Sequence, residues 1–222
     1  MEFIQTKDGK EDIEAMAKLI VTLLQEEQKV LWLICGGSNI PLAKRAMDMI
    51  RASSGEKTSN LTVGQTDERY GPVGHKDSNW QQMLETGFDF SDVKTRPILT
   101  GKSLEETVED FARDLAQDFA NYDMVVAQFG IGADGHVAGM LPHTDGIKEK
   151  SLAFGYDSPP FVRITMTPPA FENITSAYTF AFGDSKKKAI TNLLTKDLPF
   201  EDEPCQILKR IPDSYFYSDQ LG

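Results

Sequence analysis

Residues 30–38 read VLWLICGGS, a short apolar run that ends in two glycines and a serine. An unbroken apolar run of this length is typical of a strand that is buried on both faces, as in a parallel sheet. Pro41 follows at a place that suits the first turn of a helix, where the missing proline N–H costs little. The stretch therefore predicts a buried strand, a glycine loop and a helix that reaches about Arg51.

Apolar segments of strand length recur along the chain and alternate with helical patterns. Leu104, Val108 and Phe111, for example, lie on one helical face that begins with the capping-box pair Ser103 and Glu106. Strands are predicted at residues 61–66, 124–129, 161–167, 177–182 and 215–217, and helices at 11–27, 41–51, 78–87, 103–119 and 184–194. This alternation predicts an α/β fold, a Rossmann-like three-layer arrangement with a mostly parallel sheet and helices on both faces. Because no repeat or linker interrupts it, we expect one domain over residues 1–222.

The composition excludes several classes of partner. The formal net charge of −11 disfavours nucleic acids and anionic membranes, since an acidic surface repels phosphate. Any anionic ligand therefore needs a local cluster of basic side chains. The two cysteines are distant in sequence and form no disulfide framework, and the three scattered histidines form no zinc pattern, so we expect no metal and no cofactor. The acidic first residues contain no apolar signal core, and a cytoplasmic location is expected.

Four predicted strands end in polar or glycine-rich sequence, after Cys35, Thr66, Phe129 and Phe182. In open α/β sheets, ligands bind outside the carboxyl ends of the strands. We therefore expect the functional site where these four ends meet.

The loop Gly36-Gly37-Ser38 fits two interpretations. Between a strand and a helix start, glycines let the backbone approach an anion and helix N–H groups point at it. A plain tight turn explains the same residues equally well. Cys35 beside the loop is more often a small apolar residue than a nucleophile.

A second glycine loop, Gly130 to Gly135, matches G-x-G-x-x-G after a strand. A dinucleotide site is disfavoured because it needs a long helix directly afterwards, and Pro142 interrupts the segment. The loop presents Asp134 and His136 at a strand end, and an imidazole can accept a proton from water near neutral pH. A histidine that only satisfies loop hydrogen bonds is the alternative.

Basic side chains near the expected site are Arg69, Arg163 and Lys186. Lys186 lies at a helix start, three residues past Gly183, although a lysine run is usually a solvated face. Each of these residues alone is a weak signal. A dianionic ligand needs several of them together.

Taken in order, these segments resemble those of 6-phosphogluconolactonases. That family shares its fold, which is of the sugar-phosphate isomerase type, with glucosamine-6-phosphate deaminases. The segments are Cys35-Gly36-Gly37-Ser38 with Pro41, Thr66-Asp67-Glu68-Arg69, Asp77-Ser78-Asn79, Gly130 to His136 with Leu141-Pro142-His143-Thr144, Arg163 to Thr167, and Gly183 to Lys186. The resemblance implies hydrolysis of 6-phospho-D-glucono-1,5-lactone to 6-phosphogluconate, a step of the pentose phosphate pathway.

The resemblance also implies roles for single residues. His136 is the expected general base, and Asp134 either orients its imidazole or shapes the loop. Asp67 is expected to order sugar hydroxyls or water. The implied phosphate contacts are Gly36, Gly37, Ser38, Arg163 and Lys186, while Arg69 is expected to reach either the phosphate or the developing carboxylate.

Two features separate the lactonase from the deaminase. Deaminase-type loops carry a glutamate five positions after the histidine, and here that position is Leu141, which cannot carry a proton. Arg69 stands where the deaminases typically have an aromatic residue. Cys35 and Asn39 depart from the serine and threonine usual in the lactonases.

A non-catalytic sugar-phosphate sensor is a third interpretation, disfavoured because such regulators carry a basic DNA-binding segment in front. The expected partner is a small sugar phosphate lactone, and monomer and dimer both remain open.

Overall fold

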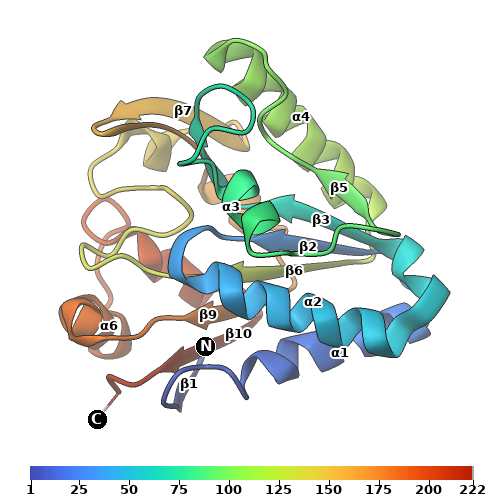
Figure 1. Cartoon of the computed structure of the whole chain (residues 1–222). Coiled ribbons are helices and arrows are strands. Elements are labelled where there is room, and N and C mark those ends of the chain that lie inside the picture. Colours follow the sequence, from blue (N-terminus) through green and yellow to red (C-terminus); the bar gives the residue numbers. More distant parts are fainter. Residues whose placement is uncertain (222) are drawn as a thin grey trace.

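The computed structural model describes residues 1–221, and for residue 56 only the backbone. Its main sheet has seven strands in the order β1-β10-β9-β6-β2-β3-β5, and all of its strand pairs are parallel (Figure 1). The strands are β1 (Glu2–Gln5), β2 (Val30–Ile34), β3 (Leu61–Gln65), β5 (Lys94–Arg96), β6 (Met124–Phe129), β9 (Ser176–Phe180) and β10 (Asp213–Ser218). The apolar run at the start of residues 30–38 is β2, which lies inside this sheet between β3 and β6.

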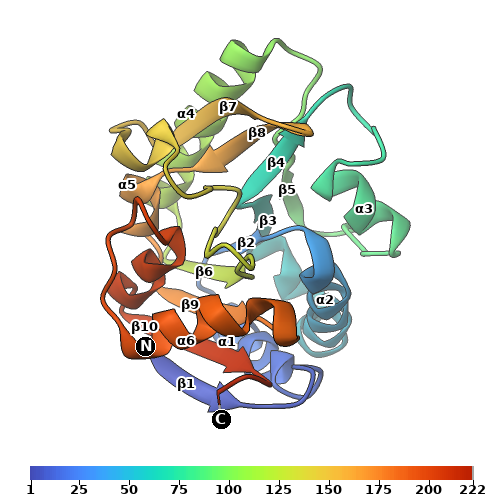
Figure 2. The same cartoon turned by 90° about the vertical axis from the view of Figure 1, so that its left-hand side faces the viewer.

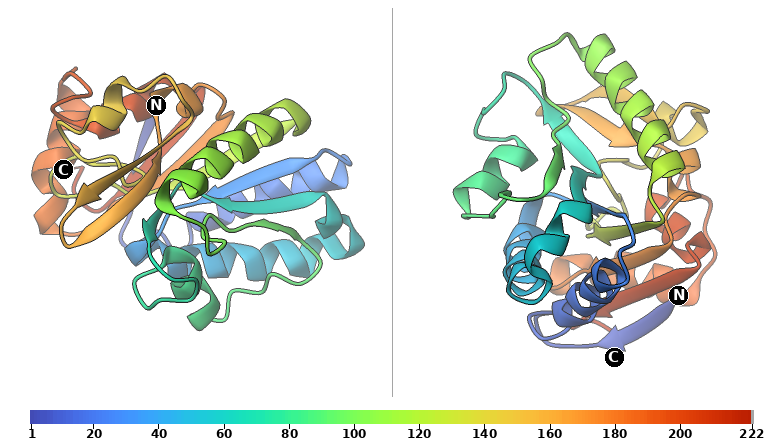
Figure 3. Two further views of the ribbon diagram at one scale, coloured as in Figure 1. Left: turned by 90° about the horizontal axis from the view of Figure 1, so that it is seen from above. Right: turned by 90° about the vertical axis from the view of Figure 1, so that its right-hand side faces the viewer.

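Each face of the main sheet carries its own hydrophobic core. Successive side chains of a strand point to opposite faces, so Trp32 packs toward one core and Leu31 and Leu33 toward the other. The first core is covered by α1 (Ile13–Gln25) and α2 (Ile40–Ser54), which lie side by side (Figure 3). The second core is covered by α4 (Leu104–Asn121), α5 (Pro168–Phe171), α6 (Lys187–Thr195) and the 3₁₀ segment η5 (Pro204–Arg210). The predicted α/β fold with helices on both faces is confirmed.

The predicted helix starts are present, with small differences at the ends. Ser103 and Glu106 form the expected capping box of α4. Ser78 caps α3 (Asn79–Glu85) by accepting a hydrogen bond from the Gln81 N–H. Helix α2 continues three residues beyond Arg51 and ends at Ser54, and the next residue, Gly55, has a φ of 54°, which suits a residue without a side chain. The shorter 3₁₀ turns are η1 (Gly37–Asn39), η2 (Gly55–Asn60), η3 (Asp145–Lys148) and η4 (Asp184–Lys186).

A second sheet lies beside the carboxyl ends of the main one, and the sequence did not predict it. It has three antiparallel strands in the order β4-β8-β7: β4 (Asp67–Tyr70), β8 (Phe161–Met166) and β7 (Ala153–Ser158) (Figure 2). The expected strand at 161–167 is therefore present but belongs to this sheet. Residues 67–69, expected as a polar strand end, form their own strand because β8 supplies a partner for them. Among the described helices, none is long and apolar enough to cross a membrane.

Candidate functional site

A pocket of about 220 Å³ opens where the carboxyl ends of the main sheet meet the second sheet. All predicted site residues except Asp134 line it, together with Cys35, Asn39 and parts of both glycine loops. The lining predicted residues are Gly36, Gly37, Ser38, Asp67, Arg69, His136, Arg163 and Lys186. The pocket thus joins segments that lie more than 140 residues apart in the chain.

The first glycine loop needs glycine at two positions for different reasons. At Gly36, a Cβ atom would overlap the buried Asn79 carboxamide, so the close approach excludes a side chain. At Gly37 there is open space, but the φ of 70° is a conformation that glycine adopts without strain. The loop leads into η1 and α2, whose first N–H groups have no intrahelical partner. This is the geometry of an anion-binding loop.

Asn39 fixes that loop to the main sheet. Its Nδ2 donates hydrogen bonds of 3.0 Å to the carbonyl oxygens of Phe129 and Phe180, at the ends of β6 and β9. Gln128 Nε2 donates to the Asn39 carbonyl over 3.1 Å. Burial raises the pKa of the Cys35 thiol to about 12, so the thiol stays protonated and is a poor nucleophile. Cys35 and Asn39, which differ from the serine and threonine usual in the lactonases, therefore leave the loop intact.

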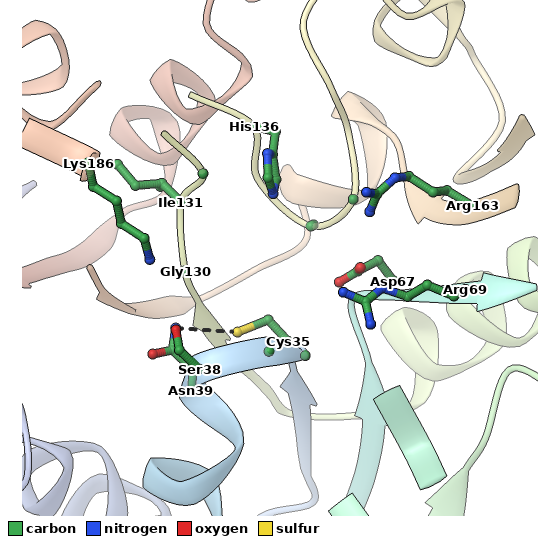
Figure 4. Close-up of a pocket in the computed structure, with 15 residues that line it drawn as sticks. Cys35, Ser38, Asn39, Asp67, Arg69, Gly130, Ile131, His136, Arg163 and Lys186 are labelled. Carbon is green, nitrogen blue, oxygen red and sulfur yellow. Dashed lines mark hydrogen bonds between the residues drawn. The ribbon is translucent and has the colours of Figure 1, made fainter. Parts of the chain in front are cut away.

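His136 and Asp134 form a close pair on the second glycine loop. His136 Nδ1 lies 2.6 Å from Asp134 Oδ1, which also accepts a hydrogen bond from the His136 N–H over 3.2 Å. The hydrogen bond from the His136 side chain lowers the pKa of Asp134 to about 2. An ionised carboxylate can only accept hydrogen bonds, so Nδ1 of the ring carries the hydrogen. The neutral ring then has its lone pair on Nε2, and Figure 4 shows the imidazole pointing into the pocket.

The loop that carries His136 is held by its own hydrogen bonds and by the second sheet. The Gly132 N–H donates to the His136 carbonyl over 2.9 Å, and a Cβ at Gly132 would overlap the imidazole. On the far side, Tyr156 of β7 donates its hydroxyl to the Gly139 carbonyl over 2.7 Å. Thr165 of β8 donates to the Ala138 carbonyl. The ring therefore has a fixed position relative to the second sheet.

Arg69 and Arg163 stand directly opposite each other on β4 and β8. Arg69 donates from an Nη atom to the Asp77 carbonyl over 3.0 Å. Among the side chains that the structure describes, neither arginine has a carboxylate within 4.0 Å. The Nε atoms of both are buried and find no hydrogen-bond partner in the described part of the chain. Figure 4 shows both guanidinium groups on the same side of the pocket as Asp67.

Lys186 approaches the pocket from the opposite side, near Ser38 (Figure 4). It ends η4, which follows Gly183. Burial lowers the pKa of Lys186. Within the described residues it too has no carboxylate within 4.0 Å. In a chain with a net charge of −11, three basic side chains without an acidic partner thus line one pocket, as an anionic ligand requires.

Glu68 is the residue that sequence reasoning missed. It is fully buried between Asp67 and Arg69, and it accepts hydrogen bonds from the backbone N–H groups of Arg69, Asn79 and Trp80. Further donors to its carboxylate are the Gln65 side-chain amide and the Ser78 hydroxyl. Glu68 thereby ties β4 to the start of α3. The sequence did contain a signal for this role: an acidic residue at a strand end, ten residues before the helix cap Ser78.

Asp67 faces the pocket, and its carboxylate accepts a 2.8 Å hydrogen bond from the Thr66 hydroxyl. The Asn79 amide donates to the Asp67 carbonyl over 3.0 Å. Among the side chains that the structure describes, no group of three histidine, cysteine or acidic residues could hold a metal ion.

The family described as glucosamine-6-phosphate isomerases/6-phosphogluconolactonase matches residues 8–215. The chain belongs to this family. A relative from the rat, a 6-phosphogluconolactonase, is 28% identical over 72% of this chain and 67% of its own length. A glucosamine-6-phosphate deaminase from Lactobacillus johnsonii is 26% identical over the whole of this chain and 96% of its own length.

A solved structure confirms the fold of this family member. The crystal structure of the 6-phosphogluconolactonase from Thermotoga maritima superposes with a TM-score of 0.81 and covers 98% of both chains, at 21% sequence identity. The family includes lactonases and deaminases, so the family alone does not decide between the two reactions.

Proposed function

We propose that this chain hydrolyses 6-phospho-D-glucono-1,5-lactone to 6-phosphogluconate, with His136 as the general base. One observation carries the proposal. An imidazole, hydrogen-bonded to an ionised carboxylate, shares a pocket with three basic side chains that have no acidic partner among the described residues. The similarity to 6-phosphogluconolactonases supports the same reaction.

The proposed chemistry begins with a water molecule between His136 Nε2 and the lactone carbonyl. As the water oxygen bonds to the carbonyl carbon, its proton passes to Nε2, and the carbonyl oxygen becomes an oxyanion. Loop N–H groups and a guanidinium group are the donors available to that oxyanion. When the tetrahedral centre collapses, the bond to the ring oxygen breaks, and protonated His136 returns its proton to this leaving oxygen. The product is an open-chain acid, which ionises at neutral pH.

The basic side chains position the substrate. We assign the 6-phosphate to the Gly36-Gly37-Ser38 loop with Arg163 and Lys186, which approach the pocket from its two sides. Arg69, which stands opposite Arg163 on the neighbouring strand, is assigned to the same phosphate, and Asp67 to sugar hydroxyls or the attacking water. Contacts to the phosphate, far from the carbonyl, hold the ester in line with the water, which is a large source of rate enhancement.

A deaminase reaction is disfavoured by the residue five positions after His136. That reaction must open a sugar ring and move protons between carbon atoms, whereas Leu141 has no group that carries a proton. In the structure the Leu141 N–H donates to the Tyr156 hydroxyl over 3.2 Å, so this position supports the loop through its backbone.

The test is a pair of assays on the purified protein. Lactone hydrolysis is followed by the appearance of 6-phosphogluconate, with the spontaneous reaction subtracted, and ammonia release from glucosamine 6-phosphate is followed in parallel. We expect lactonase turnover that is lost in His136→Ala, and no ammonia. Ammonia release without lactonase turnover would contradict the proposal.

A further inference from the structure

The aromatic ring of Phe161 contacts both arginines of the pocket. Phe161 is the first residue of β8, two positions before Arg163. The guanidinium carbon of Arg69 lies 5.2 Å from the centre of this ring, and that of Arg163 lies 5.5 Å from it. One ring thus contacts two guanidinium groups that come from different strands.

The pairing of Arg69 with Arg163 has a cost that the ring offsets. Like charges directly opposite each other in an antiparallel pair repel. No described carboxylate lies within 4.0 Å of either arginine to reduce that repulsion. The negative face of an aromatic ring attracts cations that lie within about 6 Å of its centre, and both guanidinium groups meet this condition.

We propose that Phe161 is a positioning residue for the anionic substrate: its ring holds Arg69 and Arg163 together at the pocket before the substrate arrives. This inference rests on the proposed function, since it takes the anion to be a sugar phosphate. A preformed pair loses less side-chain freedom when the anion binds, which strengthens binding. Without the ring the two cations are free to separate, and the anion must reassemble them.

The role in binding predicts a specific kinetic pattern. Phe161 does not line the pocket beside His136, so its loss leaves proton transfer unchanged. In Phe161→Leu we expect KM for the lactone to rise about 5- to 30-fold, from the loss of two cation–π contacts, with kcat nearly unchanged. Phe161→Tyr keeps the ring and is expected to restore KM. The affinity for inorganic phosphate, measured by calorimetry, is expected to fall in the leucine variant alone.

The chain offers a matched control. Arg210 lies 4.3 Å from the centre of the Phe200 ring, and neither residue lines the pocket. Phe200→Leu therefore removes a similar contact elsewhere and is expected to leave KM and phosphate affinity unchanged. If Phe161→Leu fails to fold, Phe161→Met removes the ring with an unbranched, flexible side chain that can fill an irregular space, and it tests the same point.

Three results would overturn the inference. They are unchanged KM and phosphate affinity in a folded variant without the ring, a fall of kcat with KM unchanged, and failure of the tyrosine variant to restore binding. Phosphate binding does not depend on turnover. If the wild-type protein has no lactonase activity, but removal of the Phe161 ring still weakens phosphate binding, the proposed function fails while the role of Phe161 stands.

Discussion

Two sheets build the pocket, and they hold their functional side chains in different ways. The main sheet contributes loops at the ends of its strands, with His136 and Lys186 on them and the Gly36-Gly37-Ser38 loop beside them. The second sheet contributes side chains directly on strands, Asp67 and Arg69 on β4 and Arg163 on β8. Glycine loops bring backbone N–H groups and an imidazole to the substrate, whereas strands fix the position of cations.

The two kinds of support correspond to different roles in the proposed mechanism. The main-sheet loop with His136 and Asp134 is assigned the proton transfer. The strands of the second sheet hold two of the three cations assigned to the anion, Arg69 and Arg163, and Lys186 is the third. Substitutions of His136 and Asp134 are therefore expected to change kcat, and substitutions of Arg69 and Arg163 to change KM.

The largest expected effect lies in the loop region. His136→Ala removes the proposed general base, and we expect kcat to fall about 10²- to 10⁴-fold. KM and the affinity for inorganic phosphate are expected to stay near their wild-type values, because the basic side chains remain. Steady-state kinetics with subtraction of spontaneous hydrolysis measures this.

His143→Asn is the control for that experiment. The His143 side chain is 73% exposed and does not line the pocket, and asparagine tolerates its φ of 60°. We expect wild-type kinetics. A kcat for His136→Ala close to that of the wild type would show that another group is the base.

The next largest effect belongs to the strand region. In Arg163→Ala we expect KM to rise about 10- to 150-fold, since a hydrogen bond to a charged group contributes about 1.5–3 kcal/mol. The kcat value is expected to change little. Because Arg163 faces Arg69 without a described acidic partner, its loss is not expected to lower Tm. A lower kcat with unchanged KM would contradict the division between the two sheets.

A smaller effect is expected from Asp134→Asn. The amide cannot replace the charge that orients the imidazole, so we expect kcat to fall about tenfold, for a loss of roughly 1.4 kcal/mol. The pKa of Asp134 is about 2, so its carboxylate is ionised above that pH and protonated only below it. The wild-type pH–rate profile between about pH 4 and 8 should therefore contain no step from Asp134. A profile that loses such a step in Asp134→Asn would contradict this assignment.

The smallest effect concerns Lys186 at alkaline pH. Since burial lowers the pKa of Lys186, its ammonium group loses its proton at a lower pH than an ordinary lysine does. An anion binds the protonated form, so phosphate affinity is expected to weaken a few-fold as the pH rises toward 10. Lys186→Arg keeps its charge there and should flatten this dependence. Calorimetric titrations at several pH values test it, and equal pH dependence in both proteins would count against a role for Lys186.

The same two regions differ in how far the sequence predicts them. The loop region follows from local patterns, because an apolar run followed by glycines marks both β2 and β6, and His136 comes directly after the second loop. Strand β4 has no such pattern. Three of its four residues are charged, and they form a strand because β8, almost a hundred residues later, pairs with them.

Glu68 and Phe161 escape sequence reasoning for the same reason. The role of Glu68 depends on donors from β3 and α3, and that of Phe161 depends on the register between Arg69 and Arg163. Local periodicity contains neither the partners nor the register. The resemblance to a known family predicted the basic residues of the site, but it did not predict the residues that hold them in place.

In the proposed function, one imidazole and basic side chains from both regions surround a single small anion. The chain has three histidines, so their imidazole ¹H–¹⁵N signals can be followed separately while 6-phosphogluconate is added. We predict that the His136 signal moves along a saturable curve, that the His143 signal stays in place, and that Arg163→Ala shifts the curve to higher concentrations. Saturable binding of 6-phosphogluconate with no change at His136 would contradict the account.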